Sequence, residues 1–558
     1  MSQPELTPAR LRAEIVGIDS VIETPYGERL MLYADFTASG RSLGFIETYL
    51  QRLQRGYANS HTEDDYSGRF TTELLHQAES LIKQAVNAGE DGRIIACGSG
   101  ATGAIDRMQQ LVGVKLPAAT RSLLNSLLQG FLGSGRSADF DAYMAAHRPV
   151  VFVGPYEHHS NEISWRESLA TVVEVRMDAS GGIDLAHLEE LLRAPEFQGR
   201  LRIGSFSAAS NVTGMRSPVE RIAVLLHRHD ALAMFDFAAS APYVKIDMNP
   251  PAIGPDEDAS MDAVFISPHK FLGGPGASGL LIFNKRCYHA ELPPSMAGGG
   301  TVDYVGPDEH DFIGDIEARE KAGTPGILQT LKAALAFAVK SAVGSERIER
   351  LEAEMTREAM QRWGAHRNIE ILGNPDPDRR VAIISFNIRD PKGYHLHPRF
   401  VTTLLNDLFG IQSRAGCSCA GPYGHKLLDI DPVKAAEYRQ WITRGYHGVK
   451  PGWCRIGFHY TFDRHDLDFL LACVEFVAER GHQFVHQYHF DARDGRWRHR
   501  GGHTEQARLS LCDALAPGQV NGGALCDEER GARYREYLRL AAAAADALPG
   551  THRDGCSC

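Results

Sequence analysis

The chain has 558 residues, of which 43% are hydrophobic and 23% charged. This composition is that of an ordinary globular protein, and it excludes a collagen, a coiled-coil rod and a largely disordered chain. Lysine and arginine number 59 against 70 aspartate and glutamate residues, which gives a formal net charge of −11. This acidic balance argues against non-specific binding to nucleic acid or to an anionic membrane surface.

The sequence also indicates where in the cell the protein is located. No stretch approaches the ~20 apolar residues that a membrane span needs, and the N-terminal segment has no apolar signal core. We therefore expect a cytoplasmic protein that has no membrane partner. Its ten cysteines are then expected to be thiols rather than disulfides.

From about residue 93 to residue 285, short apolar runs alternate with helical patterns. Nearly continuous apolar strands separated by helices predict a mostly parallel sheet covered on both faces. One helix has its own start signal, with Ser217 as N-cap, Pro218 as first residue and Glu220 closing a capping box. Ligands of such sheets bind beyond the carboxyl ends of the strands. The runs predicted as strands are RIIAC, PVVFVGP, TVVEVRMD, LRIGSFS, ALAMFDFA, DAVFIS and SGLLIFN.

A second α+β pattern follows a long helical stretch. We predict a large domain over residues 61–330 and a smaller C-terminal domain over 331–484, onto which an N-terminal segment, 1–60, packs. Residues 485–558 are predicted to be a C-terminal extension. Residues 117–149 are expected to be an insertion with one helix.

Two charged residues end two of the apolar runs. Lys270 follows DAVFIS and a short turn, and precedes a glycine-rich loop. A partly desolvated lysine can attack an aldehyde, although a lysine taken alone is more often a surface residue. Asp236 ends the run ALAMF, where a buried carboxylate needs a cationic or hydrogen-bonding partner. Pyridoxal 5′-phosphate (PLP) fits such a pair through its aldehyde and its protonated ring nitrogen; a structural salt bridge is the alternative.

Three further features could complete a cofactor site. The turn Gly98–Gly103 follows a strand and opens a helix, so its N–H groups could bind phosphate, with Ser267 and His269 as further donors. A glycine-rich turn is, however, more often only a turn. His158 could stack on an aromatic ring, and the absence of further ligands at suitable spacing argues against a metal site. Asn211 could bind a cofactor oxygen or a substrate carboxylate.

The order of the motifs resembles the class V aminotransferase family of fold-type I PLP enzymes, and within it the cysteine desulfurase and selenocysteine lyase branch. The resemblance implies an α/β fold with a mostly parallel seven-stranded sheet in the large domain and a smaller α+β C-terminal domain. It also implies PLP as cofactor, a small amino acid as substrate and a homodimer. The motifs, from about residue 30 to residue 480, are YADFTASG, ANSHT, GSGATGAI, EHHSN, SNVTG, DFAASAPY, SPHK, GGGT, AGTP, RAGCSC and CRIGFHY.

The resemblance carries cofactor roles onto matching residues. Lys270 would carry PLP as an internal aldimine and then move the α-proton of the substrate. Asp236 would pair with the ring nitrogen, and His158, also counted as catalytic, would stack on the ring. Thr324 would reach a phosphate in the neighbouring subunit. The remaining residues expected to bind the cofactor are Ala101, Thr102, Asn211, Ser267 and His269.

The resemblance also implies substrate-binding residues and a nucleophile. Arg455 would bind the α-carboxylate through its planar fork, with a surface salt bridge as the alternative, and Asn211 and Arg414 would also contact the substrate. Cys419, in the loop SRAGCSCAGP, would take the substrate's sulfur as a persulfide. Arg414 and His425 could lower the pKa of this thiol; the alternative is a cysteine that merely packs.

Two departures from the family pattern leave questions open. Ala239 stands where desulfurases commonly have glutamine. The pair Cys417 and Cys419 looks more like the desulfurase half of molybdenum cofactor sulfurases, yet the tail after residue 485 is too short and wrongly patterned for their second domain. Cys556 and Cys558 repeat the spacing and could accept sulfur, as could a separate acceptor protein; a flexible tail without such a role is the alternative, and the one that we favour.

These observations leave three hypotheses. The first is a cysteine desulfurase or selenocysteine lyase that leaves alanine. The second is an aminotransferase, epimerase or lyase acting on another amino acid, with Cys419 incidental. The third is a scaffold or regulator without activity, against which the presence of Lys270, Asp236 and His158 argues.

Overall fold

The computed structural model describes residues 6–60, 64–252, 254, 257–502 and 525–548. The chain forms two compact units, which are described separately. The sheet unit comprises Ser39–Ser210 and Met215–Ile348, and the cysteine-loop unit comprises Met1–Ala38, Asn211–Gly214 and Glu349–Cys558. The bounds of these two units differ from those of the predicted domains.

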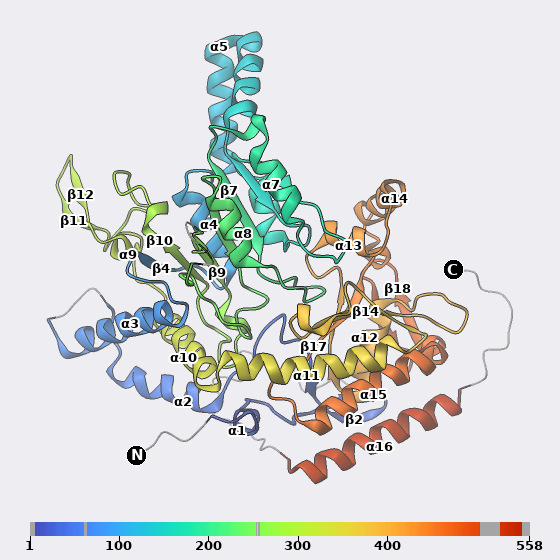
Figure 1. The fold of residues 1–558 in the computed structure, drawn as a ribbon. Coiled ribbons are helices and arrows are strands. Elements are labelled where there is room, and N and C mark those ends of the chain that lie inside the picture. Colours follow the sequence, from blue (N-terminus) through green and yellow to red (C-terminus); the bar gives the residue numbers. More distant parts are fainter. Residues whose placement is uncertain (1–5, 61–63, 253, 255–256, 503–524, 549–558) are drawn as a thin grey trace. The chain divides into compact units, whose positions relative to one another are not determined.

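A seven-stranded sheet forms the centre of the sheet unit, in the order β4-β10-β9-β8-β7-β5-β6 (Figure 1). The five strands from β9 to β6 run parallel, while β10 is antiparallel to both of its neighbours. The predicted mostly parallel sheet and its seven apolar runs are thus confirmed. The strands are β4 (Gly92–Ala96), β5 (Val150–Val153), β6 (Thr171–Glu174), β7 (Arg202–Ser207), β8 (Leu232–Asp236), β9 (Ala263–Ile266) and β10 (Leu280–Asn284).

Helices of the sheet unit pack against these strands. Helix α4 (Ala101–Leu111) contacts β9 and β10, and α8 (Val219–His227) contacts β8. The predicted start of α8 is wrong, because its N-cap is Pro218. The Ser217 hydroxyl instead donates to the Ser207 carbonyl at 2.6 Å. The other elements of this unit are α2 (Gly44–Leu53), α3 (Tyr66–Ala85), α6 (Ile163–Arg166), α7 (Leu185–Arg193), β11 (Val302–Val305), β12 (His310–Phe312), α9 (Ile316–Arg319) and α10 (Ile327–Val343).

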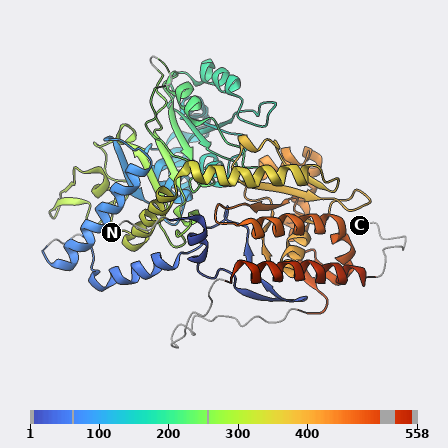
Figure 2. The same cartoon turned by 60° about the horizontal axis from the view of Figure 1, so that its bottom comes forward.

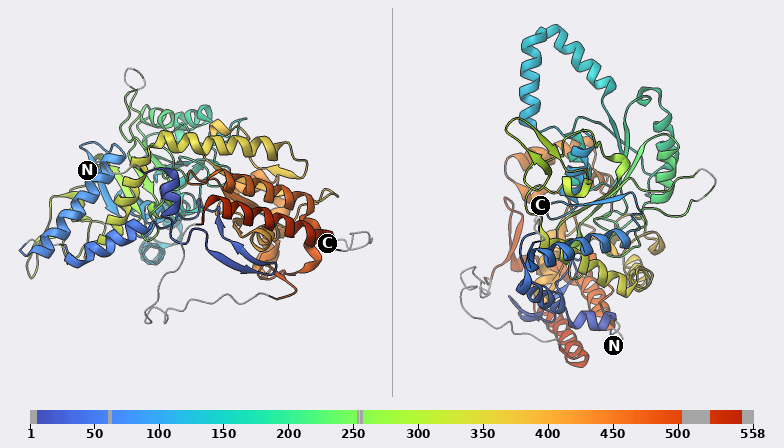
Figure 3. Two further views of the ribbon diagram at one scale, coloured as in Figure 1. Left: turned by 90° about the horizontal axis from the view of Figure 1, so that it is seen from below. Right: turned by 90° about the vertical axis from the view of Figure 1, so that its left-hand side faces the viewer.

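The segment α5 (Ala118–His147) extends away from the sheet as two helices (Figures 1 and 3). The expected single helix is wrong, because Gly133 has a φ of 72° and breaks the segment. Glycine adopts this left-handed region without the steric cost of a side chain. Leu123, Leu127 and Phe131 on the first helix are exposed.

The cysteine-loop unit is built on a four-stranded antiparallel sheet in the order β13-β14-β17-β16. Helices α12 (Pro398–Phe409) and α15 (Arg464–Arg480) contribute apolar faces to its core. This arrangement confirms the predicted smaller α+β pattern. Its strands are β13 (Ile369–Ile371), β14 (Ile383–Ile388), β16 (Arg414–Gly416) and β17 (Trp453–Gly457); its remaining elements include α1 (Pro8–Ala13), β1 (Val21–Thr24), β2 (Gly27–Leu30), β3 (Leu32–Tyr33), β15 (Ile411–Gln412), α13 (Gly421–Leu427), α14 (Pro432–Thr443), β18 (Tyr488–Asp491) and β19 (Arg496–His499). Helix α11 (Ser345–Gly364) begins in the sheet unit and continues here.

Helix α16 (Asp527–Asp546) lies beside α15 (Figure 2). The Tyr534 ring stacks on Phe469 at 4.0 Å between centroids. Arg530 is buried and forms ion pairs with Asp463 and Asp466. This part of the predicted extension therefore belongs to the core of the unit. Cys556 and Cys558 lie outside the described residues.

Candidate active site

Lys270 and Asp236 follow neighbouring parallel strands at the same edge of the sheet. Asp236 is the last residue of β8, and Lys270 lies in the short turn after β9, three residues beyond Ser267. Asp236 is buried, and its Oδ1 accepts the N–H of Ala238 at 2.8 Å. Burial raises the pKa of Asp236, while the hydrogen bond from Ala238 and the positive charge of Lys270 act to lower it. The charge of Lys270 therefore acts on Asp236, as expected for the predicted pair.

The glycine-rich turn lies against the segment that carries Lys270. Ser267 Oγ accepts the N–H of Ala101, the first residue of α4, at 2.9 Å. A Cβ placed on Gly100 would lie 3.1 Å from Ser267 Oγ and 3.5 Å from His269 Nε2. The absence of a side chain at Gly100 thus leaves room for the close approach of hydroxyl, imidazole and backbone. Burial and the charge of Lys270 lower the pKa of His269 to about 4, so its ring is neutral at pH 7.

A hydrogen-bonded chain joins this turn to the histidine after β5. Thr102 Oγ1 lies 2.7 Å from Ser160 Oγ, and Ser160 Oγ lies 3.1 Å from His158 Nδ1. The Ser160 N–H also donates to His158 Nδ1, so this nitrogen acts as an acceptor. The structure brings the predicted residues Thr102 and His158 together through Ser160, to which the sequence analysis gave no role.

Glu157, next to His158, is a buried acid that the sequence analysis quoted only within a motif. Its carboxylate accepts hydrogen bonds from Gly154, Asn161 and Ser207, the last through both the backbone N–H and the hydroxyl. Burial raises the pKa of Glu157 to about 7, although the hydrogen bonds from Ser207 and Asn161 act to lower it. The nearby charge of Asp236 also raises this pKa. Glu157 therefore ties the end of β7 to the turn that holds His158.

The donor set at this edge fits PLP. The carboxyl ends of β4, β5, β8 and β9 meet here, since these strands run in one direction. Hydroxyls, the neutral His269 ring and the start of α4 suit a phosphate, and a buried carboxylate suits a protonated ring nitrogen. Lys270 is half-buried rather than a surface lysine. Ala239 is buried, and its side chain has no polar group that could bind a cofactor.

The cysteine-loop unit gathers the predicted substrate-binding residues around Asp35. Arg455 on β17 donates from Nη2 to Asp35 Oδ1 at 2.8 Å and is only 3% exposed. A surface salt bridge does not describe this arginine. Arg414, paired with Arg455 across β16 and β17, places Nη1 3.7 Å from the other oxygen of Asp35. Asp35 lies in the motif YADFTASG, which was the available sequence signal for it.

Asn211 connects Arg455 to the cysteine loop. Its carbonyl accepts from Arg455 Nη1 at 3.0 Å, and its Nδ2 donates to the carbonyl of Ser418 at 2.7 Å. Its buried Oδ1 has no hydrogen-bond partner among the described residues. A buried acceptor left in this state favours a ligand group that donates to it.

Cys419 lies in a tight turn that precedes α13. The Ala420 N–H donates to the Cys417 carbonyl at 3.0 Å, and the two residues between them, Ser418 and Cys419, have positive φ values of 49° and 56°. These signs are those of a type I′ turn. Cys419 is exposed and Cys417 partly exposed, so Cys419 does not merely pack in a core.

Thr324 is exposed, and its hydroxyl accepts from Asn59 of the same chain at 2.9 Å. Its predicted contact with a neighbouring subunit stays a prediction.

No group of three or more metal-binding side chains occurs among the described residues. In the part of the chain that the structure describes, no single helix is long and apolar enough to cross a membrane. Of the helices described there, only α10 and α11, which meet at an angle of 74°, together reach the length and apolar composition of a membrane span.

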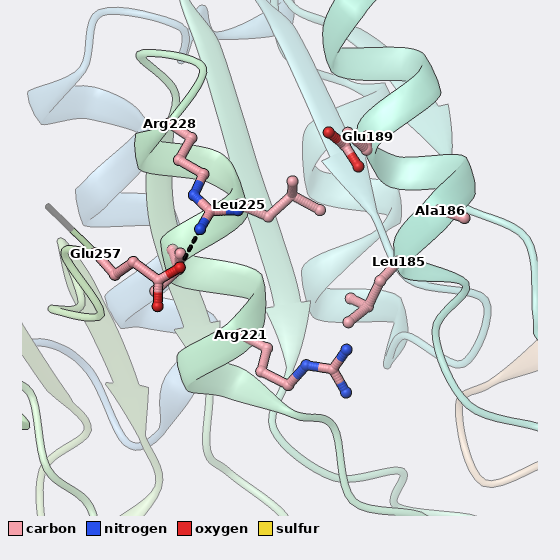
Figure 4. Close-up of a pocket in the computed structure, with 8 residues that line it drawn as sticks. Leu185, Ala186, Glu189, Arg221, Leu225, Arg228 and Glu257 are labelled. Carbon is pink, nitrogen blue, oxygen red and sulfur yellow. Dashed lines mark hydrogen bonds and ion pairs between the residues drawn. The ribbon is translucent and has the colours of Figure 1, made fainter. Parts of the chain in front are cut away.

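A separate surface pocket of about 440 Å³ lies between α7 and α8 (Figure 4). Leu185, Leu225 and Arg221 line it, as do Arg228 and Glu257, which form an ion pair. None of the predicted site residues lines this pocket.

The fold and the sheet-edge residues define a fold-type I PLP-dependent enzyme. The family model for aminotransferase class-V matches residues 142–470, more than half of the chain. The chain therefore belongs to the aminotransferase class-V family.

Relatives of known name share most of the chain. A probable cysteine desulfurase from Halalkalibacterium halodurans is 27% identical over 436 residues, which cover 77% of this chain and 94% of the relative. A probable cysteine desulfurase from Staphylococcus aureus strain Mu50 is 26% identical over 439 residues, which cover 77% of this chain and 93% of the relative.

Two solved structures have the same fold. A cysteine desulfurase from Thermococcus onnurineus NA1 superposes with a TM-score of 0.64 at 19% identity, covering 86% of this chain and 99% of the other. The cysteine desulfurase CsdA from Escherichia coli gives a TM-score of 0.58 at 19% identity, covering 85% of this chain and 98% of the other.

Proposed function

We propose that this protein removes sulfur from L-cysteine, or selenium from selenocysteine, and leaves alanine. The observation that carries the proposal is the buried Asp236 at the end of β8 with Lys270 in the turn after the adjacent strand β9, in a chain of the aminotransferase class-V family. The exposed thiol of Cys419 supplies a group that can take the sulfur. The names of the relatives favour this activity over others of the family.

PLP supplies the chemistry that the side chains lack, because its ring accepts the electrons left when a bond at the substrate's α-carbon breaks. Lys270 would hold its aldehyde, Asp236 its ring nitrogen and His158 its ring face. The residues that would hold its phosphate are Ala101, Thr102, Ser267 and His269, with Thr324 of a second subunit in a homodimer.

The residues of the chain then bind and orient the substrate. Arg455, whose fork Asp35 and the Asn211 carbonyl hold in place, binds the α-carboxylate. Lys270 would take the proton from the substrate's α-carbon with its amine. Asn211 Oδ1 accepts a hydrogen bond from the cofactor or the substrate.

Cys419 takes the sulfur. Its thiolate attacks the substrate's sulfur, and the bond from that sulfur to the β-carbon breaks. The electron pair of this bond stays with the β-carbon, which takes up a proton and becomes the methyl group of alanine, and Cys419 becomes a persulfide. A thiol on an exposed turn can then present this sulfur to an acceptor, and an acceptor protein is part of the proposal.

The test compares wild type with Cys419→Ser and, as a matched control, with Cys526→Ser, which changes another exposed thiol. We expect the release of alanine from L-cysteine to fall about 1,000-fold in Cys419→Ser, as for loss of a nucleophile. Bound PLP, read from its visible absorbance, stays at the wild-type level in both variants. A wild-type protein that forms neither alanine nor sulfide from cysteine, nor alanine from selenocysteine, contradicts the proposal.

Ala239 favours a second candidate, an aminotransferase, epimerase or lyase acting on another amino acid. The same variants separate the two. Under this alternative Cys419→Ser turns over as fast as wild type on a panel of amino acids, with the products identified by mass spectrometry.

A further inference from the structure

Two thiols share the turn that carries the proposed nucleophile. Cys417 occupies its first position and Cys419 its third, and the hydrogen bond from Ala420 to the Cys417 carbonyl closes it. Both side chains reach solvent to some extent. By contrast, Cys97, Cys287, Cys454 and Cys473 are buried.

The turn shortens the distance between the two cysteines. In an extended strand, residues two apart have Cα atoms about 7 Å from each other. Disulfides require a Cα separation of about 4.4–6.8 Å. A chain that reverses direction through two left-handed residues, Ser418 and Cys419, brings positions 417 and 419 closer than a strand does.

Both ends of the turn and its middle are held. Gly416, just before it, pairs with Trp453 in the sheet, and Ala420, just after it, is fully buried. Asn211 donates to the Ser418 carbonyl at 2.7 Å. The left-handed conformation of two residues that are not glycine costs on the order of 1 kcal/mol each, so these contacts maintain the turn that has Cys417 at its first and Cys419 at its third position.

We propose that Cys417 is a resolving cysteine, which releases the sulfur taken by Cys419 as hydrosulfide; this inference rests on the proposed function. The Cys417 thiolate attacks Sγ of the Cys419 persulfide and forms a Cys417–Cys419 disulfide. The bond between Cys419 Sγ and the terminal sulfur breaks, and that sulfur leaves with the electron pair as HS⁻. In this step Cys417 Sγ is oxidised and the transferred sulfur is reduced, while Cys419 Sγ keeps its oxidation level, so the step needs no outside oxidant.

A dithiol reductant then restores the enzyme. It reduces the Cys417–Cys419 disulfide to two thiols and is itself oxidised to a disulfide by thiol–disulfide exchange. In the presence of such a dithiol, the protein would release free sulfide from cysteine without an acceptor protein. In its absence, the enzyme stops after one turnover in the disulfide form.

The experiment uses full-length, PLP-loaded protein in which Cys556 and Cys558 are replaced by serine, so that no other Cys-x-Cys pair can react. Reduced enzyme, freed of reductant, is mixed with one equivalent of L-cysteine, so that no thiol remains in excess, blocked with an alkylating reagent and digested for mass spectrometry. Alanine and sulfide are measured in parallel. Cys417→Ser is compared with the parent protein, and Cys526→Ser serves as control.

The proposal predicts that the parent and the Cys526→Ser control form one equivalent each of alanine and sulfide. The peptide that contains both cysteines becomes two hydrogens lighter and resists alkylation. Cys417→Ser forms alanine but no sulfide, and its Cys419 becomes one sulfur atom heavier. If the parent keeps the extra sulfur on Cys419 as Cys417→Ser does, the resolving role is wrong and the desulfurase proposal stands. If no alanine forms, the proposed function itself is wrong, and the resolving role falls with it.

Discussion

The sheet edge and the cysteine turn hold their reactive groups in opposite ways. At the sheet edge, Asp236 and Ser267 are each 4% exposed and fixed by backbone hydrogen bonds. On the turn, Cys419 is exposed in a left-handed conformation. A cofactor that stays bound through many turnovers needs buried partners, whereas a sulfur atom that must leave needs an exposed carrier. The comparison implies that changes at the sheet edge reduce cofactor binding, and that changes of the cysteines in the turn leave it intact.

The variant Asp236→Asn should distinguish the sheet edge from the cysteine turn most clearly. We expect PLP affinity and turnover each to fall about 100-fold, because a charged hydrogen bond to the ring nitrogen, worth roughly 1.5–3 kcal/mol, is lost. Titration of the apoprotein with PLP, followed by absorbance, measures the affinity. Cys419→Ser, titrated in parallel, binds PLP like wild type. Equal loss of PLP affinity in both variants would break the comparison.

Arg455→Lys tests the substrate side. Lysine keeps the charge but loses the planar fork that matches a carboxylate, so we expect KM for cysteine to rise about 10-fold with a smaller change in kcat. PLP affinity and the melting temperature are measured alongside, since Arg455 also contacts Asp35 and Asn211. A variant with unchanged KM would show that this arginine only joins strands of its unit.

Glu157→Gln probes the buried support of the sheet edge. The pKa of Glu157 is raised to about 7 in the folded protein from an ordinary 4.5. Its protonated form therefore adds stability at low pH, and this stability is lost as pH rises from about 4.5 through 7. Because glutamine does not titrate, the stability of wild type relative to Glu157→Gln should fall by about 3 kcal/mol between pH 4.5 and 8. Denaturant unfolding at several pH values measures it, and a constant difference would contradict the assignment.

Much of the sheet could be predicted from the sequence, because buried parallel strands are continuous apolar runs bounded by polar residues. The carboxyl-edge rule then placed Lys270 and Asp236 together, since both follow such runs. The start of α8 was missed, because the Ser217 hydroxyl bonds to the distant strand β7 instead of the helix that follows it.

The partners of the site residues were harder to predict. Asp35 is 420 positions from Arg455 in the chain, and no local pattern reveals a pairing at that separation. The role of Ser160 depends on the rotamers of Thr102 and His158, which only tertiary packing fixes. The core position of α16 was also missed, because an alanine-rich helix gives little apolar pattern, while its buried Tyr534 and Arg530 find partners on α15.

The most direct test of the account is to find the atom that holds the cofactor. The protein is loaded with PLP, reduced with borohydride, digested and analysed by tandem mass spectrometry. The account predicts a pyridoxyl-phosphate adduct on Lys270, and none at this position in Lys270→Ala. An adduct on another lysine, or none at all in protein saturated with PLP, would contradict it.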